Sequence, residues 1–194
     1  MSQAVLISIR PEWCERIASG QKTIEVRKTK PSAILPLKCY IYCTKPSFPH
    51  EDFLVFDAGT NKVKAFYGGG KVIGEFVCHN IFPLSFYASD VSFFDTEPPM
   101  GVPGTCLTDK EIVEYLGNGK TGYGWLISDL VIYDKPKELG EFMRKPCDFA
   151  ASCGVCVHAV REDIGGFSGV PVDCDLTVKR PPQSWCYVEE LEDE

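Results

Sequence analysis

Short apolar stretches separated by polar and glycine-rich segments predict a chain built mainly from β-strands. Residues 5 to 9 form a continuous apolar run of the strand type. Residues 22 to 28 alternate instead, with Thr23, Glu25 and Arg27 falling on one side. This alternation predicts a half-buried strand that presents three polar side chains on a single face.

Five further stretches have the β-branched and aromatic content of strands. One of them, residues 54 to 66, contains a turn sequence at residues 58 to 61 and therefore predicts a hairpin. Residues 80 to 107, rich in aromatics and prolines, show no clear period and are expected to be loop with short irregular elements. No internal repeat is visible and the strand spacing mostly does not suit βαβ units, so largely antiparallel pairing is expected. The other stretches are residues 38 to 44, 71 to 78, 123 to 133 and 184 to 189.

Helices are predicted at two or three places by their terminal residues. Pro11 opens one helix at a position where proline is tolerated, and Gly20 ends it. Thr108 followed by Glu111 forms a capping box for a second helix, and residues 136 to 143 resemble a short third one. These elements together predict an α+β protein: a mixed, largely antiparallel β-barrel with two or three flanking helices.

The length of 194 residues suits one domain, or one domain with an insert, and is enough to bury a sizeable core. No apolar run approaches the roughly 20 residues that a membrane-spanning helix needs. The first ten residues lack a basic segment followed by an apolar stretch, so no secretion signal is expected. A cytoplasmic protein without a membrane partner is therefore predicted.

Charge is distributed unevenly along the chain. The net charge of -7 argues against a protein that coats long duplex DNA by bulk phosphate attraction. Residues 1 to 45, however, hold eight Lys or Arg against three acids, whereas five acids lie in the last six residues. A local basic face on an acidic body suits one bound anion or a short single strand.

Ten cysteines are a large number for a chain of this length. Without a secretion signal, thiols or metal ligands are expected rather than disulfides. Four cysteines cluster in one glycine-rich segment with a CxxC pair, and four thiolates suit a tetrahedral zinc ion. His158 or Cys186 could replace one ligand, while an iron–sulfur cluster and free thiols are alternative interpretations. The predicted zinc ligands are Cys147, Cys153, Cys156 and Cys174.

Three segments resemble one known family. Residues 20 to 28, GQKTIEVRK, carry the pattern G-x-K-x-x-E-x-R that follows the first helix of ASCH domains. Residues 8 to 11 and Ile17 precede it in the order that this family shows. Residues 42 to 46 and 122 to 136 also resemble ASCH proteins found in bacterial and prophage genomes.

The resemblance covers roughly residues 4 to 145 and implies a PUA-like barrel. The expected organisation is therefore an ASCH domain over residues 1 to 145. A cysteine-rich insert or extension packed on the domain then occupies residues 146 to 180. A closing strand and an acidic tail follow over residues 181 to 194.

The resemblance also implies a cleft beside the first helix and the second strand that accepts RNA or a nucleoside. Lys22 and Arg27 can grip a phosphate or a base carbonyl, while Glu25 can accept from an exocyclic amine. Arg10 and Thr44 are further candidate ligands. Taken without the resemblance, these side chains could equally form a solvated face with a surface ion pair.

Glu75 is the remaining candidate for the ligand cleft. In a regular strand it shares a face with Ile73 and Val77, and only a bulge would put it out of phase with them. An inward carboxylate would either be a cleft residue or need a partner. A salt bridge on an edge strand is the alternative.

The expected function is the binding of RNA or a nucleotide-like ligand in a basic cleft. Some small ASCH proteins are amidohydrolases that act on acylated cytidine, with a nucleophilic threonine three residues after a lysine. Glu25 stands at that position here, so Lys22 carries over without its nucleophile, and Thr23 would have to act from a shifted position. Hydrolysis of a modified nucleoside or of RNA is thus the alternative, and a phage-related regulatory or protein-interaction module is a third.

No motif indicates a different class of enzyme. The sequence contains no Ser-His-Asp set, P-loop or dinucleotide-binding GxGxxG pattern. The three histidines, His50, His79 and His158, lie far apart in the sequence and are interpreted as surface or packing residues.

Overall fold

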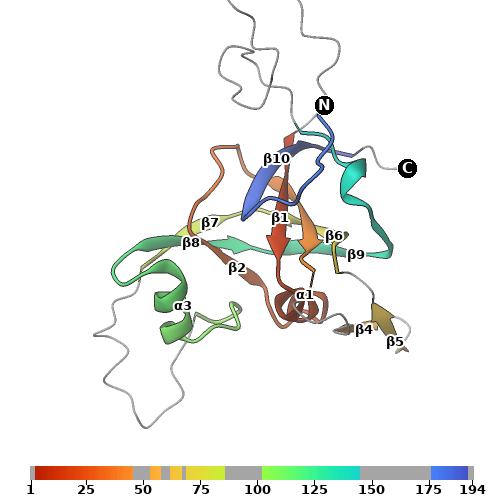
Figure 1. Ribbon diagram of the computed structural model, residues 1–194. Helices are drawn as coiled ribbons and strands as arrows, with labels where there is room; N and C mark the ends of the chain where they lie inside the picture. The colour runs from red at the N-terminus through yellow and green to blue at the C-terminus, as the bar shows by residue number, and fades with distance from the viewer. Residues whose placement is uncertain are drawn as a thin grey trace, which may run out of the picture.

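The computed structural model describes residues 3–45, 69–85, 102–144 and 176–191, and the backbone alone of residues 53–57 and 62–66. Its largest element is a five-stranded sheet with the strand order β10-β1-β3-β6-β9 (Figure 1). The pair β1–β3 is parallel and the other three pairs are antiparallel. The five strands are β1 (Gln3–Ile9), β3 (Leu37–Cys43), β6 (Lys71–Cys78), β9 (Ser128–Lys137) and β10 (Trp185–Glu189).

A second, three-stranded sheet is antiparallel and has the order β2-β8-β7. Its strands are β2 (Ile24–Arg27), β8 (Thr121–Leu126) and β7 (Ile81–Ser85). Only Ile127 separates β8 from β9, so the two sheets are joined there by continuous chain. A separate hairpin consists of β4 (Phe53–Asp57) and β5 (Lys62–Phe66), as residues 54 to 66 predict.

Two α-helices among the described residues lie where their terminal residues predict them. Helix α1 (Pro11–Ala18) begins at its proline. Helix α3 (Asp109–Leu116) begins with the expected capping box, in which the Thr108 hydroxyl accepts from Glu111 N and the Glu111 carboxylate accepts from Thr108 N. With these helices, the predicted α+β class of mixed, largely antiparallel topology is confirmed.

Three local predictions differ from the structure in part. Residues 123 to 133 are parts of two strands in different sheets rather than one strand. The expected loop over 80 to 107 contains β7, whose Ile81 pairs with Trp125. Residues 136 to 143 hold only the short 3-10 helix η1 (Leu139–Glu141), because β9 continues to Lys137.

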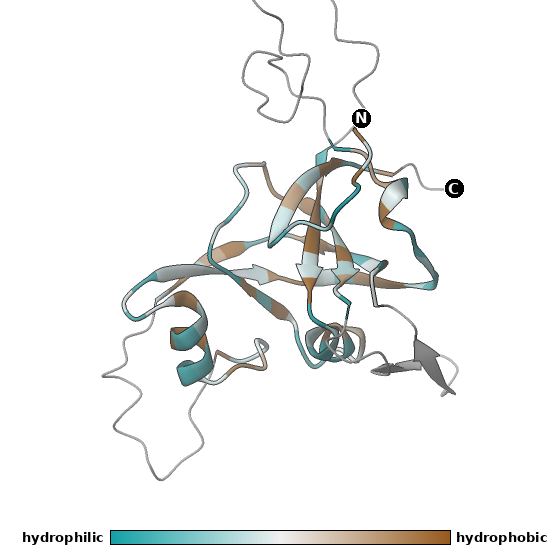
Figure 2. Ribbon diagram, viewed as in Figure 1, coloured by the Kyte–Doolittle hydropathy of each residue, from teal (hydrophilic) through white to brown (hydrophobic). Residues whose placement is uncertain are grey.

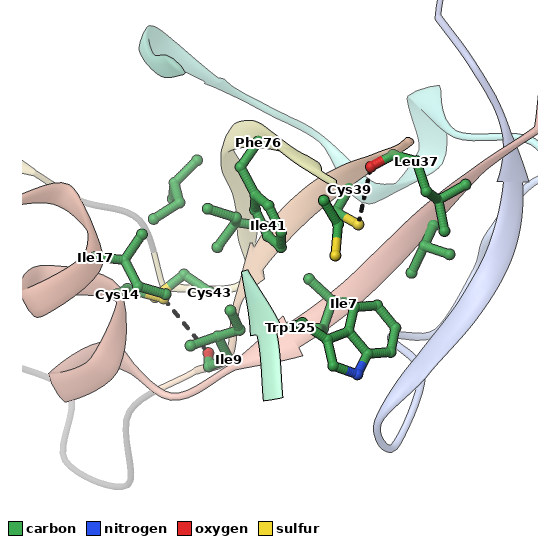
Figure 3. Close-up of a cluster of buried hydrophobic side chains, with 13 residues drawn as sticks. Ile7, Ile9, Cys14, Ile17, Leu37, Cys39, Ile41, Cys43, Phe76 and Trp125 are labelled. Carbon is green, nitrogen blue, oxygen red and sulfur yellow. Dashed lines mark hydrogen bonds between the residues drawn. The ribbon is translucent and has the colours of Figure 1, made fainter. Parts of the chain in front are cut away.

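The hydrophobic core lies between one face of the large sheet, helix α1 and strand β8. Trp125 is completely buried there against side chains of β1, β3 and β6 (Figure 3). Figure 2 shows β1 as apolar along most of its length, which is expected for a strand buried on both faces. A smaller cluster fixes α3 to the second sheet through Val26, Leu84, Ile112 and Leu116.

Within the described residues, no helix is both long enough and apolar enough to cross a membrane.

Candidate functional site

A cleft of about 1170 Å³ opens where the ends of β1 and β3, helix α3 and the segment 179–183 meet beside β2. Strand β2 and the segment before it bring the predicted residues Lys22, Glu25 and Arg27 to this cleft, and Arg10 and Thr44 also line it. The three side chains from the β2 region are called the triad below. Five of the six predicted ligand residues are therefore neighbours in space.

Lys22 is almost completely buried, with 2% of its side chain exposed. Its ammonium donates to the carbonyl oxygens of Ile24 at 2.9 Å and Thr105 at 2.7 Å, and lies 3.3 Å from Glu25 Oε2. It also lies 5.3 Å from the centre of the Trp13 ring. Burial lowers the pKa of Lys22, and the neighbouring Glu25 carboxylate counteracts only part of that effect.

Arg27 connects the triad to β1 and to the C-terminal part of the chain. Its Nη2 donates to the Ser8 carbonyl at 2.5 Å and lies 3.0 Å from Glu25 Oε1. Nη1 donates to the Ser184 hydroxyl at 3.5 Å, and Ser8 Oγ donates to the carbonyl of Pro182 at 2.6 Å. These bonds hold the segment that precedes β10 against the cleft.

Two polar atoms of the triad are buried without a hydrogen-bond partner among the described residues: Glu25 Oε2 and Arg27 Nε. The Glu25 atom has the Lys22 ammonium as an ion-pair neighbour, but that contact lacks hydrogen-bond geometry. Buried polar atoms are satisfied in the great majority of cases, and exceptions concentrate at functional sites. An acceptor and a donor are thus left without a hydrogen bond beneath the floor of the cleft, with almost no surface open to solvent.

The triad is not the solvated surface face that its spacing alone allows. The Glu25 and Arg27 side chains are 8% and 7% exposed, so all three charges have been removed from bulk water. One carboxylate stands between two cations, which leaves a formal charge of about +1. Removing charges from water costs several kcal/mol per ion unless they are well paired, so this arrangement suits an anionic or hydrogen-bonding ligand.

Glu75 does not line the cleft. A register shift in the β3–β6 pairing places an extra residue, Ile73, opposite the step between Ile41 and Tyr42. Because of this bulge, Glu75 does not share the face of Ile73, and it contacts Tyr133 and Lys38 instead. The contacts of Glu75 agree with the salt-bridge interpretation and not with a role as a cleft ligand.

Several residues of the cleft have no signal in the sequence. The carbonyl of Thr105 holds Lys22 from 83 positions away, and Pro182 lies 174 positions from its partner Ser8. Such contacts depend on tertiary structure, and no local spacing encodes them. Helix α3 adds Glu111, Glu114 and Tyr115 to the lining, although the sequence indicates the helix itself.

The predicted zinc ligands Cys147, Cys153, Cys156 and Cys174 lie outside the described residues. The described residues contain no group of three or more His, Cys, Asp or Glu side chains able to hold a metal ion. Four of the described cysteines, Cys14, Cys39, Cys43 and Cys78, are free and buried in the core. Figure 3 labels the first three of them. Burial raises the pKa of Cys14 and Cys39 well above the ordinary value and that of Cys78 to about 11.

No protein-family model matches the sequence, and no curated protein is significantly similar to it. Solved structures do match. The crystal structure of an ASCH protein from Zymomonas mobilis has a TM-score of 0.51 and 18% sequence identity, over 96% of this chain and 88% of that one. The chain has the fold of an ASCH domain. Two ASCH variants from the same organism, a tyrosine-to-phenylalanine and a serine-to-alanine mutant, match with equal score and identity over 91% and 89% of their chains.

This likeness to ASCH structures confirms the predicted fold. In the ASCH fold of this chain, the segment that carries G-x-K-x-x-E-x-R runs from the end of α1 into β2. The motif therefore lies at the floor of the cleft, with its lysine, glutamate and arginine in mutual contact.

Proposed function

We propose that this ASCH domain binds RNA or a nucleotide-like ligand in the cleft beside β2. The observation that carries the proposal is the buried triad, which combines a positive charge with an unpartnered acceptor and an unpartnered donor. The edge of a nucleobase offers a donor next to an acceptor, and so complements Glu25 Oε2 and Arg27 Nε. A base at the floor of the cleft would satisfy both atoms after a small side-chain movement that exposes them to it.

The phosphates of such a ligand fit the cations at the ends of β1 and β3. Arg10 lies on the lining, and its ion pair with Glu12 is long, at 3.8 Å, and exposed. Lys45 is also exposed on the lining and has no ion pair to any described residue. Both cations can therefore exchange water for phosphate at little cost, and binding should weaken with rising salt.

Fluorescence anisotropy with a labelled single-stranded RNA hexamer tests this proposal. The double variant Arg10→Ala/Lys45→Ala is expected to bind more weakly and to lower the slope of log affinity against log salt by roughly 1.4, for two lost phosphate contacts on a single strand. The control, Lys120→Ala/Lys135→Ala, removes the same charge at exposed positions outside the cleft and should bind as wild type. Equal loss of affinity in both variants would show that the RNA binds by net charge rather than in the cleft.

Hydrolysis of an acylated cytidine or of RNA is the alternative function. A buried carboxylate with an unpartnered oxygen can act as a general base, and Glu25 has one. Against this role, the Lys22 ammonium donates to two backbone carbonyls, which favours its protonated form and a binding role. Release of cytidine from an acylated cytidine by the wild-type protein, above the rate in buffer, would favour the hydrolase.

We also propose that the cysteine cluster at residues 147 to 174 binds one zinc ion. The spacing of the four thiols, including the CxxC pair, supports this proposal. Elemental analysis of untagged protein purified without added metal should find about one equivalent of zinc, because structural zinc is held strongly. One equivalent or more of iron would instead indicate an iron–sulfur cluster, and absence of both metals would leave free thiols.

A further inference from the structure

The charges that line the cleft are separated by the elements that carry them. Two carboxylates, those of Glu111 and Glu114, come from helix α3, which also contributes Tyr115. Arg10 and Lys45 come from the ends of β1 and β3, in a different part of the fold (Figure 1). We call these two parts of the lining the acidic α3 side and the basic strand-end side; Lys179, from the segment 179–183, adds a further cation to the lining.

The two carboxylates of the α3 side are not equivalent. Glu111 belongs to the capping box, where its Oε2 accepts from Thr108 N at 2.8 Å and from the Thr108 hydroxyl at 2.9 Å. These bonds lower the pKa of Glu111 and commit its carboxylate to the helix. Glu114 lies on the next turn, is exposed and has no hydrogen bond or ion pair to any described residue.

An uncommitted carboxylate limits which part of a nucleotide can lie beside it. It repels a phosphate and can only accept hydrogen bonds. The donors of a ribonucleotide are the N–H groups of its base and the hydroxyls of its sugar. If the base contacts Glu25 Oε2 and Arg27 Nε at the floor and the phosphate contacts the strand-end side, the sugar hydroxyls are the donors left for the α3 side.

We propose that Glu114 selects ribonucleotides over deoxyribonucleotides by accepting a hydrogen bond from the 2′-hydroxyl of the nucleotide in the cleft. This inference rests on the proposed function and adds its sugar specificity. Two independent observations point to the same ligand orientation. They are the free carboxylate of Glu114 on the α3 side and the unpartnered, more than nine-tenths buried atoms of Glu25 and Arg27 at the floor. The 2′-hydroxyl is the group that distinguishes RNA from DNA at a given position.

The test compares a single-stranded RNA hexamer with the DNA hexamer of corresponding sequence, on wild type and on Glu114→Ala. Wild type is expected to bind the RNA roughly tenfold to hundredfold more tightly, the range for one charge-assisted hydrogen bond. Glu114→Ala should lose most of this ratio through weaker RNA binding, while DNA binding stays equal or improves slightly. Alanine preserves the helix, since it has the highest helix propensity.

The matched control is Glu15→Ala, which removes one exposed carboxylate from helix α1 outside the cleft and should keep the wild-type ratio. An unchanged ratio in Glu114→Ala overturns the inference. So does an equal gain in RNA and DNA affinity, because that result identifies Glu114 as a simple source of repulsion. Comparable binding of the two hexamers by wild type overturns the inference alone, whereas no binding of either overturns the proposed function as well.

Discussion

Lys22 and Lys38 both lie beside glutamates, yet their pKa values shift in opposite directions. Lys22 shares a single carboxylate with Arg27, and burial lowers its pKa despite the ion pair. Lys38 is also affected by burial, but it lies 3.4 Å from Glu75 and 3.0 Å from Glu190. These two carboxylates outweigh burial and raise its pKa above the ordinary value.

The difference between these two groups lies in their exposure and in the balance of their charges. The triad is almost completely buried and carries an excess of cations, whereas the side chains of Lys38, Glu75 and Glu190 are 17% to 28% exposed and carry an excess of acids. Water screens the second group and lets it form at little cost. The buried triad costs free energy as long as no ligand balances its charge. Such a cost is expected of a binding site rather than of a surface ion pair.

The largest effect should come from removing the shared carboxylate of the triad. Glu25→Gln leaves Lys22 and Arg27 as two buried cations without a counter-charge, at a cost of about 3 to 5 kcal/mol in the free energy of unfolding. Glu75→Gln should cost about 1 kcal/mol or less, because Lys38 keeps Glu190 and the group is partly exposed. Urea denaturation measures both, and equal losses would contradict the distinction drawn between the two groups.

Ligand affinity should separate the two lysines in the same way. Lys22→Met removes the excess positive charge of the triad and the donor to the Ile24 and Thr105 carbonyls, and is expected to weaken RNA binding by about 1.5 to 3 kcal/mol. Lys38→Met removes the same charge away from the cleft lining and should leave the affinity unchanged. Anisotropy titrations measure the affinities, and circular dichroism checks that each variant is folded. Equal affinities in the two variants would place the RNA elsewhere.

A smaller effect is expected for Tyr133, whose hydroxyl donates a short hydrogen bond to Glu75 Oε2. Tyr133→Phe should lower the free energy of unfolding by about 0.5 to 1.5 kcal/mol, the net value of one such bond. RNA affinity should not change, since the bond belongs to the Lys38 group. A fall in affinity without a fall in stability would show that the two groups are coupled.

The smallest effect is a pH dependence of stability that has opposite signs for Lys22 and Lys38. Because the pKa of Lys22 in the folded state is lowered, wild type should gain stability relative to Lys22→Met as the pH rises toward 10.5, the ordinary lysine value. Because the pKa of Lys38 is raised, its contribution is complete below 10.5 and is lost as the pH rises further. Urea titrations of wild type and each variant at a series of alkaline pH values measure both trends. Parallel trends would disprove the assignment of opposite shifts.

Much of the triad could be predicted from the sequence because its members are close together in the chain. Lys22, Glu25 and Arg27 lie within six residues, and the strand period places the last two on one face. Helix ends were predictable for the same reason, since the capping box of α3 spans only four residues. Residues that are close together in the sequence can therefore be placed relative to one another from their spacing alone.

The remaining features depend on pairings that a single sequence does not specify. The sequence leaves Glu75 open between a cleft ligand and a salt bridge, because the bulge at Ile73 that determines its partners has no signal in the sequence. The apolar pattern continues through Ile127, yet the strand before it, β8, pairs with β2 and the strand after it, β9, pairs with β6 in the other sheet. The contributions of Thr105, Glu114 and residues 179–183 to the cleft arise only when distant segments meet.

One of these long-range contacts determines when the cleft can form during synthesis of the chain. Strand β10 pairs with β1, from Gln3↔Glu189 to Ile7↔Trp185, and the segment before it closes over Ser8 and Arg27. A nascent chain therefore exposes its motif on β2 long before residues 179–189 have left the ribosome and can complete the lining. A product that stopped short of β10 would carry every residue of the motif and still lack one wall of the cleft.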